Sequence, residues 1–381
     1  PELNLQNTAN GFLEIARDQA KDIMDSGRYD IFSTGTPEID YYNLFVSSNL
    51  TGNPEVIFTN INEFQVKDSG NSETIFGNYE VAPGRDLLQS YLMADGTYYT
   101  DQPDFETKQF VEEFQNRDPR LSQTYAYPGW ILIRTGTYAQ GGGVYVQQLN
   151  KNFSGYHQIK GYVNSTDNAT IQDVDFPVFR YAEILLTYAE ARAELGELTQ
   201  TDLDISINKL RDRVGMPQLT MGVKIDPVQQ ARYPEVSDPV LLEIRRERRV
   251  EMALEGYRFD DLMRWSAGKL LEKEPEGMYF PSLGKYDLTG DGVEDIFLID
   301  VSETIPSGED KEVNSLGVPL IYYRASLPDG DGGVYLENGT SGTVQTVNER
   351  GTFVEPKYYY RPIPAAQVTI NPNLEQMFGW N

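Results

Sequence analysis

Between residues 179 and 265 apolar side chains recur at helical spacing, and this pattern limits the folds open to the chain more than any other feature. The run at 179–195 places large side chains on one face: Tyr181, Ile184, Leu185, Tyr188 and Leu195. A second run at 202–214 repeats the spacing and closes with Gly215 and Pro217. Glycine just after the last apolar position is typical of a helix end. The pattern predicts two antiparallel helices joined by a short loop, a unit of the tetratricopeptide type.

Two further regions extend the predicted helical frame. Residues 8–27 carry apolar side chains at helical spacing and end at Gly27. A third helix is expected at 239–256, where Asp238 can cap the first turn and Pro239 fits inside it. A shorter helix should follow through Phe259 to Trp265. We therefore assign the helical frame to residues 8–27 and 179–265.

The rest of the chain, 33–178 and 280–381, is rich in turn signals and predicts a loop-rich lobe with short β-hairpins. Strands are expected at 54–58 and 318–324, a short helix at 87–93, and a hairpin from Trp130–Arg134 and Val144–Val146. The tail after Tyr358 should be extended, with one short turn near Ala365. The fold class predicted is mainly α, a helical frame carrying this lobe.

Composition narrows the function. The 381 residues carry a net charge of −26, which repels phosphate backbones, so nucleic acid is not expected as a partner. Cysteine is absent and His157 is the only histidine, which excludes thiolate zinc sites and metal sites with several histidines in this chain. The context of His157 is not that of a catalytic base, and we expect a surface or hydrogen-bonding role. The sequence contains no apolar run of about 18 residues, so it predicts no membrane-spanning helix.

The third predicted helix carries an acidic stripe. Glutamates recur every four residues, so their side chains share one face, and arginines fill the neighbouring faces: Glu243, Glu247, Glu251 and Glu255 with Arg245, Arg246, Arg248 and Arg249. A carboxylate metal site or the acid pair of a glycosidase is one interpretation. The other is a helix held by ion pairs to neighbouring elements. Di-iron bundles need Glu-x-x-His partners, and no histidine lies nearby, so we favour the structural interpretation.

Residues 287–295 resemble part of a calcium loop. Oxygen-bearing side chains occupy positions 1, 3, 5 and 9, with glycine at the turn position 6: Asp287, Thr289, Asp291 and Asp295, with Gly292. Position 12 is Leu298, where an EF-hand needs glutamate, so a complete EF-hand is excluded. Two alternatives remain: a short calcium loop that braces the surface, or an Asp/Gly-rich hairpin turn without metal.

Aromatic residues in turn-rich segments are the candidates for ligand contact, because their faces stack on sugar rings or apolar peptide side chains. The candidates are Trp130, Tyr127, Tyr98, Tyr79 and Phe76. Trp130 is preferred, since Tyr127-Pro128-Gly129-Trp130 places a large ring at a turn. Ordinary core packing is the alternative for each of them. Catalytic motifs of the nucleophile-elbow, phosphate-loop or dinucleotide type are absent.

The motifs occur in the order found in the SusD/RagB family. FRYAEILLTYAEA at 179–191 resembles that family's RyAEilL-YAEA signature. Further matching segments are NRDPRL at 116–121, NKLRDRVGMP at 208–217, ERRVE at 247–251, EGYRFDDLMRW at 255–265, RPIP at 361–364 and NPNL at 371–374. Each is weak alone, but the ordered set over residues 8–381 is specific. None of the aromatic candidates lies in a family motif.

The resemblance implies one domain over 1–381, with tetratricopeptide-like helices on one face and the loop-rich lobe on the other. It implies a non-catalytic lipoprotein of the outer-membrane surface, which caps a SusC-like TonB-dependent transporter and delivers oligosaccharides to it. A peptide-binding member of the family and, less favoured, a glycoside hydrolase are the alternatives. Family members are usually longer, so we expect N-terminal helices and the lipid anchor to lie outside this chain. No cofactor is expected to be required, and a structural Ca²⁺ in the 287–295 loop stays one of the two alternatives for that loop.

Overall fold

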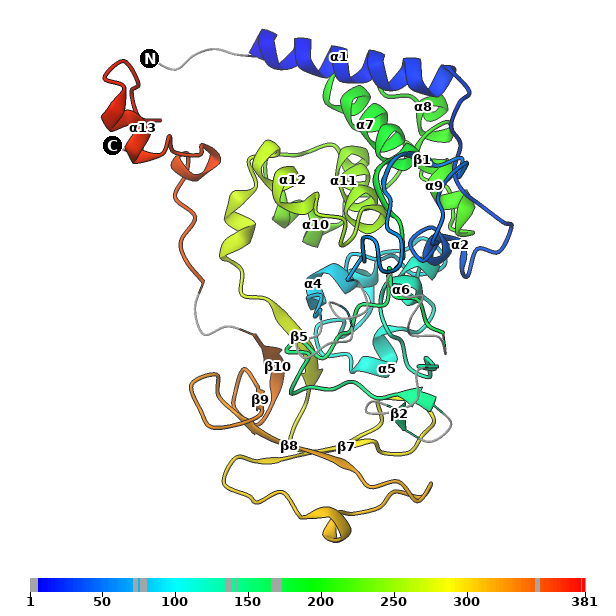
Figure 1. Cartoon of the computed structure of the whole chain (residues 1–381), viewed down its shortest axis with the longest axis vertical. Helices are drawn as coiled ribbons and strands as arrows, with labels where there is room; N and C mark the ends of the chain where they lie inside the picture. Colours follow the sequence, from blue (N-terminus) through cyan, green and yellow to red (C-terminus); the bar gives the residue numbers. More distant parts are fainter. Residues whose placement is uncertain are drawn as a thin grey trace.

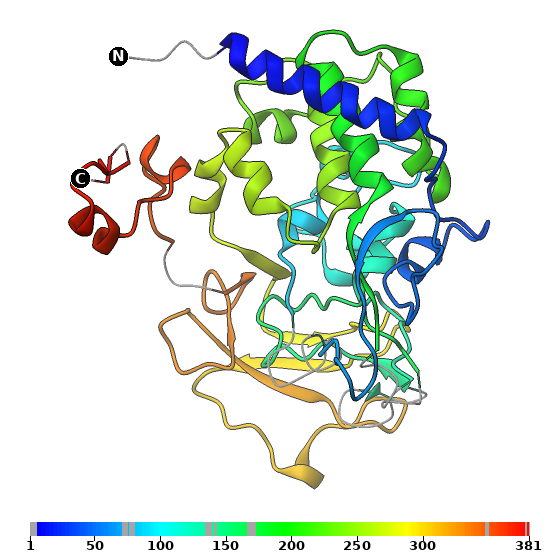
Figure 2. The same cartoon turned by 45° about the horizontal axis from the view of Figure 1, so that its top comes forward.

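The computed structural model describes residues 6–70, 75, 81–133, 139–140, 143–165, 173–346, 350–377 and 379–380. Helices gather in one half of the molecule, and loops with short strands form the other half (Figure 1). The C-terminal segment with α13 (Ala365–Ile370) stands apart from the body in Figures 1 and 2. Two of the predicted aromatic candidates, Phe76 and Tyr79, lie outside the described residues.

The helical half is organised around α7 (Tyr181–Glu194), which packs against both α1 (Gln6–Asp25) and α11 (Pro239–Glu251). These three helices confirm the predictions at 8–27, 179–195 and 239–256: α1 begins and ends two residues earlier than predicted, and α7 and α11 are a few residues shorter. Around them lie shorter helices: α8 (Gln200–Asp204), α9 (Ile207–Arg213), α10 (Pro227–Arg232) and α12 (Arg258–Arg264). Leu185, Leu210 and Ile244 are fully buried in their shared core. None of the described helices is long and apolar enough to cross a membrane.

The single helix predicted at 202–214 is instead two short helices, α8 and α9. The break lies at Ser206, whose backbone leaves the helical region with φ −129° and ψ −92°. Its hydroxyl donates to the carbonyl oxygen of Asp202 at 2.5 Å, in the preceding turn. Serine commonly bends helices through such local bonds, which compete with the backbone ladder.

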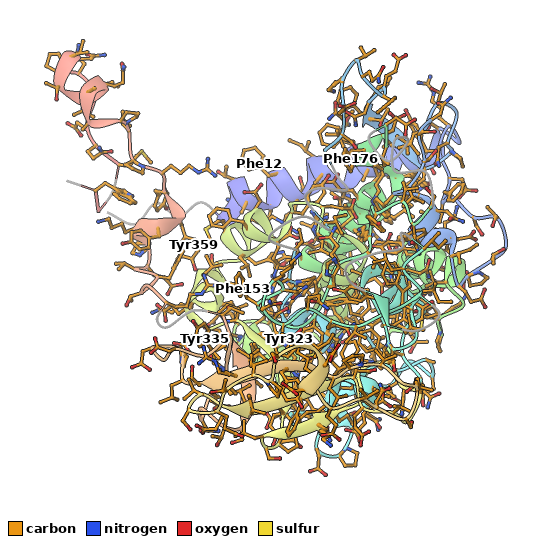
Figure 3. All side chains as sticks on the ribbon, turned by 60° about the horizontal axis from the view of Figure 1, so that its bottom comes forward. Phe12, Phe153, Phe176, Tyr323, Tyr335 and Tyr359 are labelled. Atoms are coloured by element: carbon orange, nitrogen blue, oxygen red, sulfur yellow. The ribbon has the colours of Figure 1, made fainter. Side chains whose placement is uncertain are left out.

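The lobe contains more regular β-structure than the sequence indicated. A four-stranded sheet has the order β6 (Gly284–Tyr286), β7 (Ile296–Asp300), β8 (Ile321–Ser326) and β9 (Val334–Tyr335). β6 and β7 are antiparallel, whereas β7, β8 and β9 are parallel. Figure 3 shows Tyr323 and Tyr335 on this sheet, and Tyr323 packs into the lobe core with Leu298. The fold is therefore mixed, with a helical half and a partly β lobe.

Three two-stranded sheets complete the β-structure of the described residues: β1 (Val56–Asn60) with β4 (Phe176–Arg180), β2 (Ala139–Gln140) with β3 (Val144–Tyr145), and β5 (Glu276–Phe280) with β10 (Gly342–Gln345). The short helices of the lobe include α2 (Asp40–Asn43), α4 (Arg85–Leu88), α5 (Phe110–Glu113) and α6 (Pro119–Thr124), with 3₁₀ turns at Tyr99–Asp101 and Gly308–Asp310. Two further 3₁₀ turns lie elsewhere, at Gly268–Glu272 beside α12 and at Lys357–Tyr359 in the C-terminal segment. Strands expected at 54–58 and 318–324 are confirmed within a few residues, as is the short turn near Ala365.

The predicted hairpin of Trp130–Arg134 with Val144–Val146 is present only as an isolated antiparallel bridge between Ile131 and Val144, and residues 130–133 form no regular strand. Among the described residues, two backbone bonds join this segment to residues 143–145, from Tyr145 N to Trp130 O and from Leu132 N to Gly143 O, both 2.9 Å. On the other side the side chain of Asn164 takes over, because it accepts from Ile133 N at 2.8 Å and donates to the Ile131 carbonyl at 2.7 Å. A side-chain amide thus replaces a neighbouring strand.

The glutamate stripe of α11 lies in the interior. Glu251 is fully buried and accepts from Arg180 and Arg213 at 2.7 Å and from Arg120 at 3.0 Å. Its neighbours in the stripe are engaged in the same way: Glu247 by Arg120 at 2.5 Å and Arg211 at 2.9 Å, Glu243 by Arg246 at 3.0 Å, and Glu255 by Lys160 at 2.6 Å and Arg180 at 2.8 Å. Each carboxylate has a cationic partner, which is the structural role favoured by the sequence.

We call these groups the arginine–glutamate network. It includes Glu55, which lies just before β1 and pairs with Arg180 at 2.8 Å and Arg213 at 3.2 Å. Burying one charge costs several kcal/mol, and only close pairing with further hydrogen bonds offsets this cost. The partners come from α6, β4, α9 and α11, so the network holds the lobe and the helical half together.

Replacing Glu251 with glutamine should be strongly destabilising. The variant leaves Arg180 and Arg213 buried with one carboxylate fewer, and breaking a buried pair from one side costs about 3–5 kcal/mol. Urea unfolding followed by circular dichroism measures the change. Asp30→Asn is the matched control, because Asp30 forms an exposed pair with Lys209 and should cost at most about 1 kcal/mol. An equal, small effect of both substitutions would contradict a stabilising role for the network.

The network should also make stability fall in acid. Burial opposes ionisation of Glu247, Glu251 and Glu255, but their basic partners outweigh it and lower the pKa of each below the ordinary value of 4.5. A lowered folded-state pKa contributes stability that is complete above 4.5 and is lost as the pH falls through the folded-state value. The free energy of unfolding should therefore drop below about pH 5. In Glu251→Gln this drop should be shallower, and an unchanged slope would contradict the assignment.

Candidate ligand-binding cavity

A cavity of about 750 Å³ opens in the lobe, where the turn at 127–130 meets the loop at 287–295. This volume lies within the usual range for small-molecule sites. Aromatic and aliphatic side chains form much of its wall: Ile39, Tyr42, Val111, Phe114, Tyr127 and Trp130. Polar side chains alternate with them: Glu38, Gln115, Ser122, Gln123 and Asn164. An apolar wall with a few polar groups is the usual composition of a ligand pocket.

Two predicted aromatic residues, Tyr127 and Trp130, meet at this cavity. Their backbones close a turn, in which Trp130 N donates to Tyr127 O at 2.9 Å and Gly129 has φ +82°, a conformation that favours glycine. Trp130 is only 8 % exposed and packs edge-on against Tyr145, with ring centroids 5.7 Å apart. Tyr127 is 36 % exposed. The tyrosine therefore offers the more accessible ring, and Trp130 forms mainly the wall behind it.

The polar wall is partly fixed by the frame and partly accessible. Gln123 is buried, donates to Pro37 O at 3.0 Å and accepts from Tyr42 N at 3.0 Å. The hydroxyl of Tyr42 donates to the carbonyl of Tyr162, and burial raises the pKa of Tyr42 to about 12. It therefore stays a neutral phenol at all physiological pH values. Glu38 and Gln115 are exposed at the cavity and can bond a ligand.

The loop at 287–295 joins β6 to β7 and supports the turn. Gly290 has φ +78°, and a Cβ placed there would come within 3.2 Å of Pro128. Asp295 is fully buried and accepts from Leu288 N at 2.7 Å and Thr289 N at 2.8 Å. Thr289 and Gly290 form part of the cavity wall. The conformation of this loop therefore bears directly on the position of Pro128, next to Tyr127.

The carboxylates proposed as calcium ligands face the backbone of their own loop. Asp287 accepts from Gly290 N at 2.6 Å and Gly292 N at 2.8 Å, and Asp291 accepts from Val293 N at 2.8 Å. Burial raises the pKa of Asp295. Within the described ranges, no group of three or more acidic, histidine or cysteine side chains is arranged to hold a metal. This geometry is that of the hairpin-turn alternative, and calcium remains a prediction.

The other sequence candidates lie elsewhere. Tyr98 is 7 % exposed, its hydroxyl donates to Lys224 O, and the guanidinium of Arg246 lies 5.0 Å from its ring centre. This is the core-packing alternative left open by the sequence. His157 is fully buried, with Nδ1 3.0 Å from the hydroxyl of Tyr145. It thus has the hydrogen-bonding role expected, and the surface location is wrong.

Sequence reasoning missed the residues that reach the cavity from distant segments. Tyr42, Phe114, Gln115, Gln123 and Asn164 line it, although they span more than 120 positions of the chain. One usable signal was present, because Gln115 directly precedes, and Gln123 closely follows, the recognised segment 116–121. No local pattern places Asn164 beside them.

Comparison with known proteins agrees with the fold. A model of the SusD family matches residues 47–380. A SusD-like protein of Formosa agariphila is 26 % identical over 245 residues, covering 61 % of this chain and 45 % of that protein. A SusD-like carbohydrate-binding protein of Bacteroides fragilis has a solved structure with TM-score 0.63 and 26 % identity, covering 95 % of this chain and 61 % of the other.

A second SusD-like structure from Bacteroides fragilis gives TM-score 0.58 at 22 % identity, over 96 % of this chain and 63 % of its own length. The chain thus spans less than two thirds of these relatives. The match to the family model covers most of the chain, and the solved structures share its arrangement of helices and strands. The chain belongs to the SusD family.

Proposed function

We propose that the chain binds an oligosaccharide without catalysis, in the cavity beside Tyr127 and Trp130. The cavity itself is the observation that carries this proposal: an accessible tyrosine ring backed by a tryptophan, with exposed polar groups at its edge. Sugar rings present apolar C–H faces and hydroxyl rims, and such a wall matches both. The Bacteroides fragilis relative named as carbohydrate-binding supports the same class of ligand.

The charge of the cavity favours a neutral glycan. Among the described residues that line it, Glu38 is the only charged side chain, and neither lysine nor arginine contributes. A uronic acid or sulfated sugar would meet the field of a chain with net charge −26 and no cationic partner there. Neutral hexoses avoid this penalty.

The lining residues do not favour hydrolysis. A glycosidase needs two carboxyl groups about 5–9.5 Å apart across the bond it cleaves. Glu38 stands alone as a carboxylate among the described lining residues of this cavity. The peptide-binding alternative places an apolar side chain, rather than a sugar face, against Tyr127, and a parallel ligand panel separates the two.

The finer role follows from family membership and is proposed with it. The chain would act at the surface of the outer membrane, anchored by lipid, and pass its glycan to a SusC-like TonB-dependent transporter. The helical half would form a tetratricopeptide-like frame, and residues 1–381 one domain of the whole protein. Buried ion pairs of the arginine–glutamate network join the helical half to the lobe. This supports the proposal that the protein carries its glycan as a rigid body.

Tyr127→Ala should weaken binding of a neutral oligosaccharide by about tenfold or more, as expected for losing a stacking ring. Isothermal calorimetry against panels of neutral glycans, acidic glycans and short peptides measures this. Tyr335→Ala is the control, because Tyr335 lies on β9 and does not line the cavity. Trp130→Ala should also lose binding, but with a lower melting temperature, since its ring is largely buried. Full retention of binding in Tyr127→Ala would remove the cavity from consideration.

Calcium is proposed as a brace of the 287–295 loop. If Ca²⁺ binds the folded chain, adding it after chelation should raise the melting temperature. At a free Ca²⁺ concentration one hundred times the dissociation constant, the free energy of unfolding should increase by about 2.7 kcal/mol. Asp291→Ala should abolish this response. Asp300→Ala is the control, because Asp300 accepts from Ser302 N in a comparable exposed turn. No response of the unmodified protein to Ca²⁺ would refute the site.

A further inference from the structure

A second group of arginines differs from the network in having fewer carboxylate partners than guanidinium groups. Arg232, Arg249 and Arg258 line one cavity of about 720 Å³. Among the described residues, Asp86 is the only carboxylate within ion-pair distance of any of the three, and it pairs with Arg249 at 2.6 Å. Burial opposes ionisation of Asp86, yet Arg249, Arg232 and Arg258 together hold its pKa well below the ordinary value. Asp86 is therefore shared by three guanidinium groups. The cavity wall also carries Glu106, Glu274, Glu276 and Glu337, which form no ion pair with these three arginines.

The remaining polar contacts of these arginines are neutral or missing. Arg232 lies 3.4 Å from the oxygens of Ser90 and Gln229, and Arg258 donates to the hydroxyl of Tyr233 at 3.0 Å. The side chain of Arg249 is only 9 % exposed, and its Nη1 has no hydrogen-bond partner. An unsatisfied buried charged donor is costly, so this group is prepared for an acceptor that is not yet present.

Burial also disfavours the charged form of two of these arginines. Burial and the nearby Arg249 lower the pKa of Arg232 to about 10, only partly opposed by Asp86. Burial and Arg249 also lower the pKa of Arg258. The chain has 58 acidic and 32 basic residues, so carboxylates for pairing are plentiful. The wall of the whole cavity carries six basic and five acidic side chains, so the excess of positive charge is local to the three arginines that share Asp86. This local excess points to an anionic ligand.

The surroundings indicate which anion. Arg249 and Arg258 also line an adjoining cavity of about 400 Å³, whose other walls include Leu87, Met252 and Phe259. Phe259 is 47 % exposed. A ligand that reaches both cavities carries a carboxylate next to an apolar group. An acidic residue beside an aliphatic one has this chemistry, because its apolar neighbour can pack against Leu87, Met252 and Phe259.

We propose that Arg232, Arg249 and Arg258 form a carboxylate-binding site for a polypeptide segment, with an apolar side chain of that segment entering the cavity beside Met252 and Phe259. The site is separate from the proposed glycan cavity, because the two share no lining residue. Its planar guanidinium groups suit a carboxylate, which accepts paired hydrogen bonds.

The test uses capped dipeptides at fixed ionic strength, with binding followed by the NMR signals of the arginine side chains. Acetyl-Glu-Leu-amide should bind about tenfold tighter than acetyl-Gln-Leu-amide, because only the former carries charge. It should also bind several-fold tighter than acetyl-Glu-Ser-amide. Equal binding of the Glu and Gln dipeptides overturns the proposal. Tighter binding of digalacturonate than of acetyl-Glu-Leu-amide overturns the polypeptide assignment in favour of an acidic glycan.

Arg232→Gln separates this role from a structural one. It should reduce binding of acetyl-Glu-Leu-amide about tenfold, while the melting temperature of the free protein stays level or rises, because a like-charge repulsion is removed. Arg192→Gln is the matched control, since Arg192 pairs with Glu197 at 2.9 Å and Asp202 at 3.1 Å. It should leave dipeptide binding unchanged and lower the melting temperature slightly. A marked loss of stability in Arg232→Gln, with binding retained, would contradict the proposal.

Discussion

The pairing of Glu251 with three arginines is the interaction on which the remaining structure depends. Arg180, Arg213 and Arg120 all reach this one buried carboxylate, from β4, α9 and α6. A charge removed from water is tolerated only where its partners are close and correctly oriented, so a small displacement of any one element is penalised. The network therefore fixes geometry rather than adding net stability for its own sake. It sets how the helical half meets the lobe.

The cavity inherits its shape from this network through adjacent residues. On α2, the hydroxyl of Tyr41 donates to the carbonyl of Glu251 at 2.6 Å, whereas its neighbour Tyr42 lines the cavity. Lys160 bonds Glu255, and Ile159 beside it lines the cavity. α6 likewise contributes Arg120 to the network and Gln123 to the cavity wall. Side chains that alternate between network and cavity hold the wall in place before any ligand arrives, which lowers the ordering cost of binding.

The sequence predicted what depends on local periodicity and missed what depends on long-range contact. α1, α7 and α11 follow from helical spacing, and the glutamate stripe of α11 required cationic partners because like charges at i, i+4 repel. The sequence does not show which arginines pair with the buried carboxylates, because partners such as Glu55 and Arg180 are 125 positions apart. Trp130 was preferred over Tyr127 because of its size, but the turn directs the larger ring toward Tyr145 and leaves the smaller one accessible. Local sequence identified the turn without fixing which ring would be solvated.

The segment 245–258 contains arginines in two different states, and the difference carries functional meaning. Arg246 and Arg248 each meet a carboxylate, Glu243 and Asp261 respectively, at about the distance of a strong ion pair. Arg249 must share Asp86 with two further guanidinium groups. If Arg249 served stability alone, its Nη1 donor without a hydrogen-bond partner would only cost stability. Glutamine at this position would then be better tolerated. A chain with 26 more acidic than basic residues leaves three guanidinium groups to share one carboxylate beside a partly apolar cavity. This is the arrangement expected of a surface that recognises a carboxylate supplied from outside.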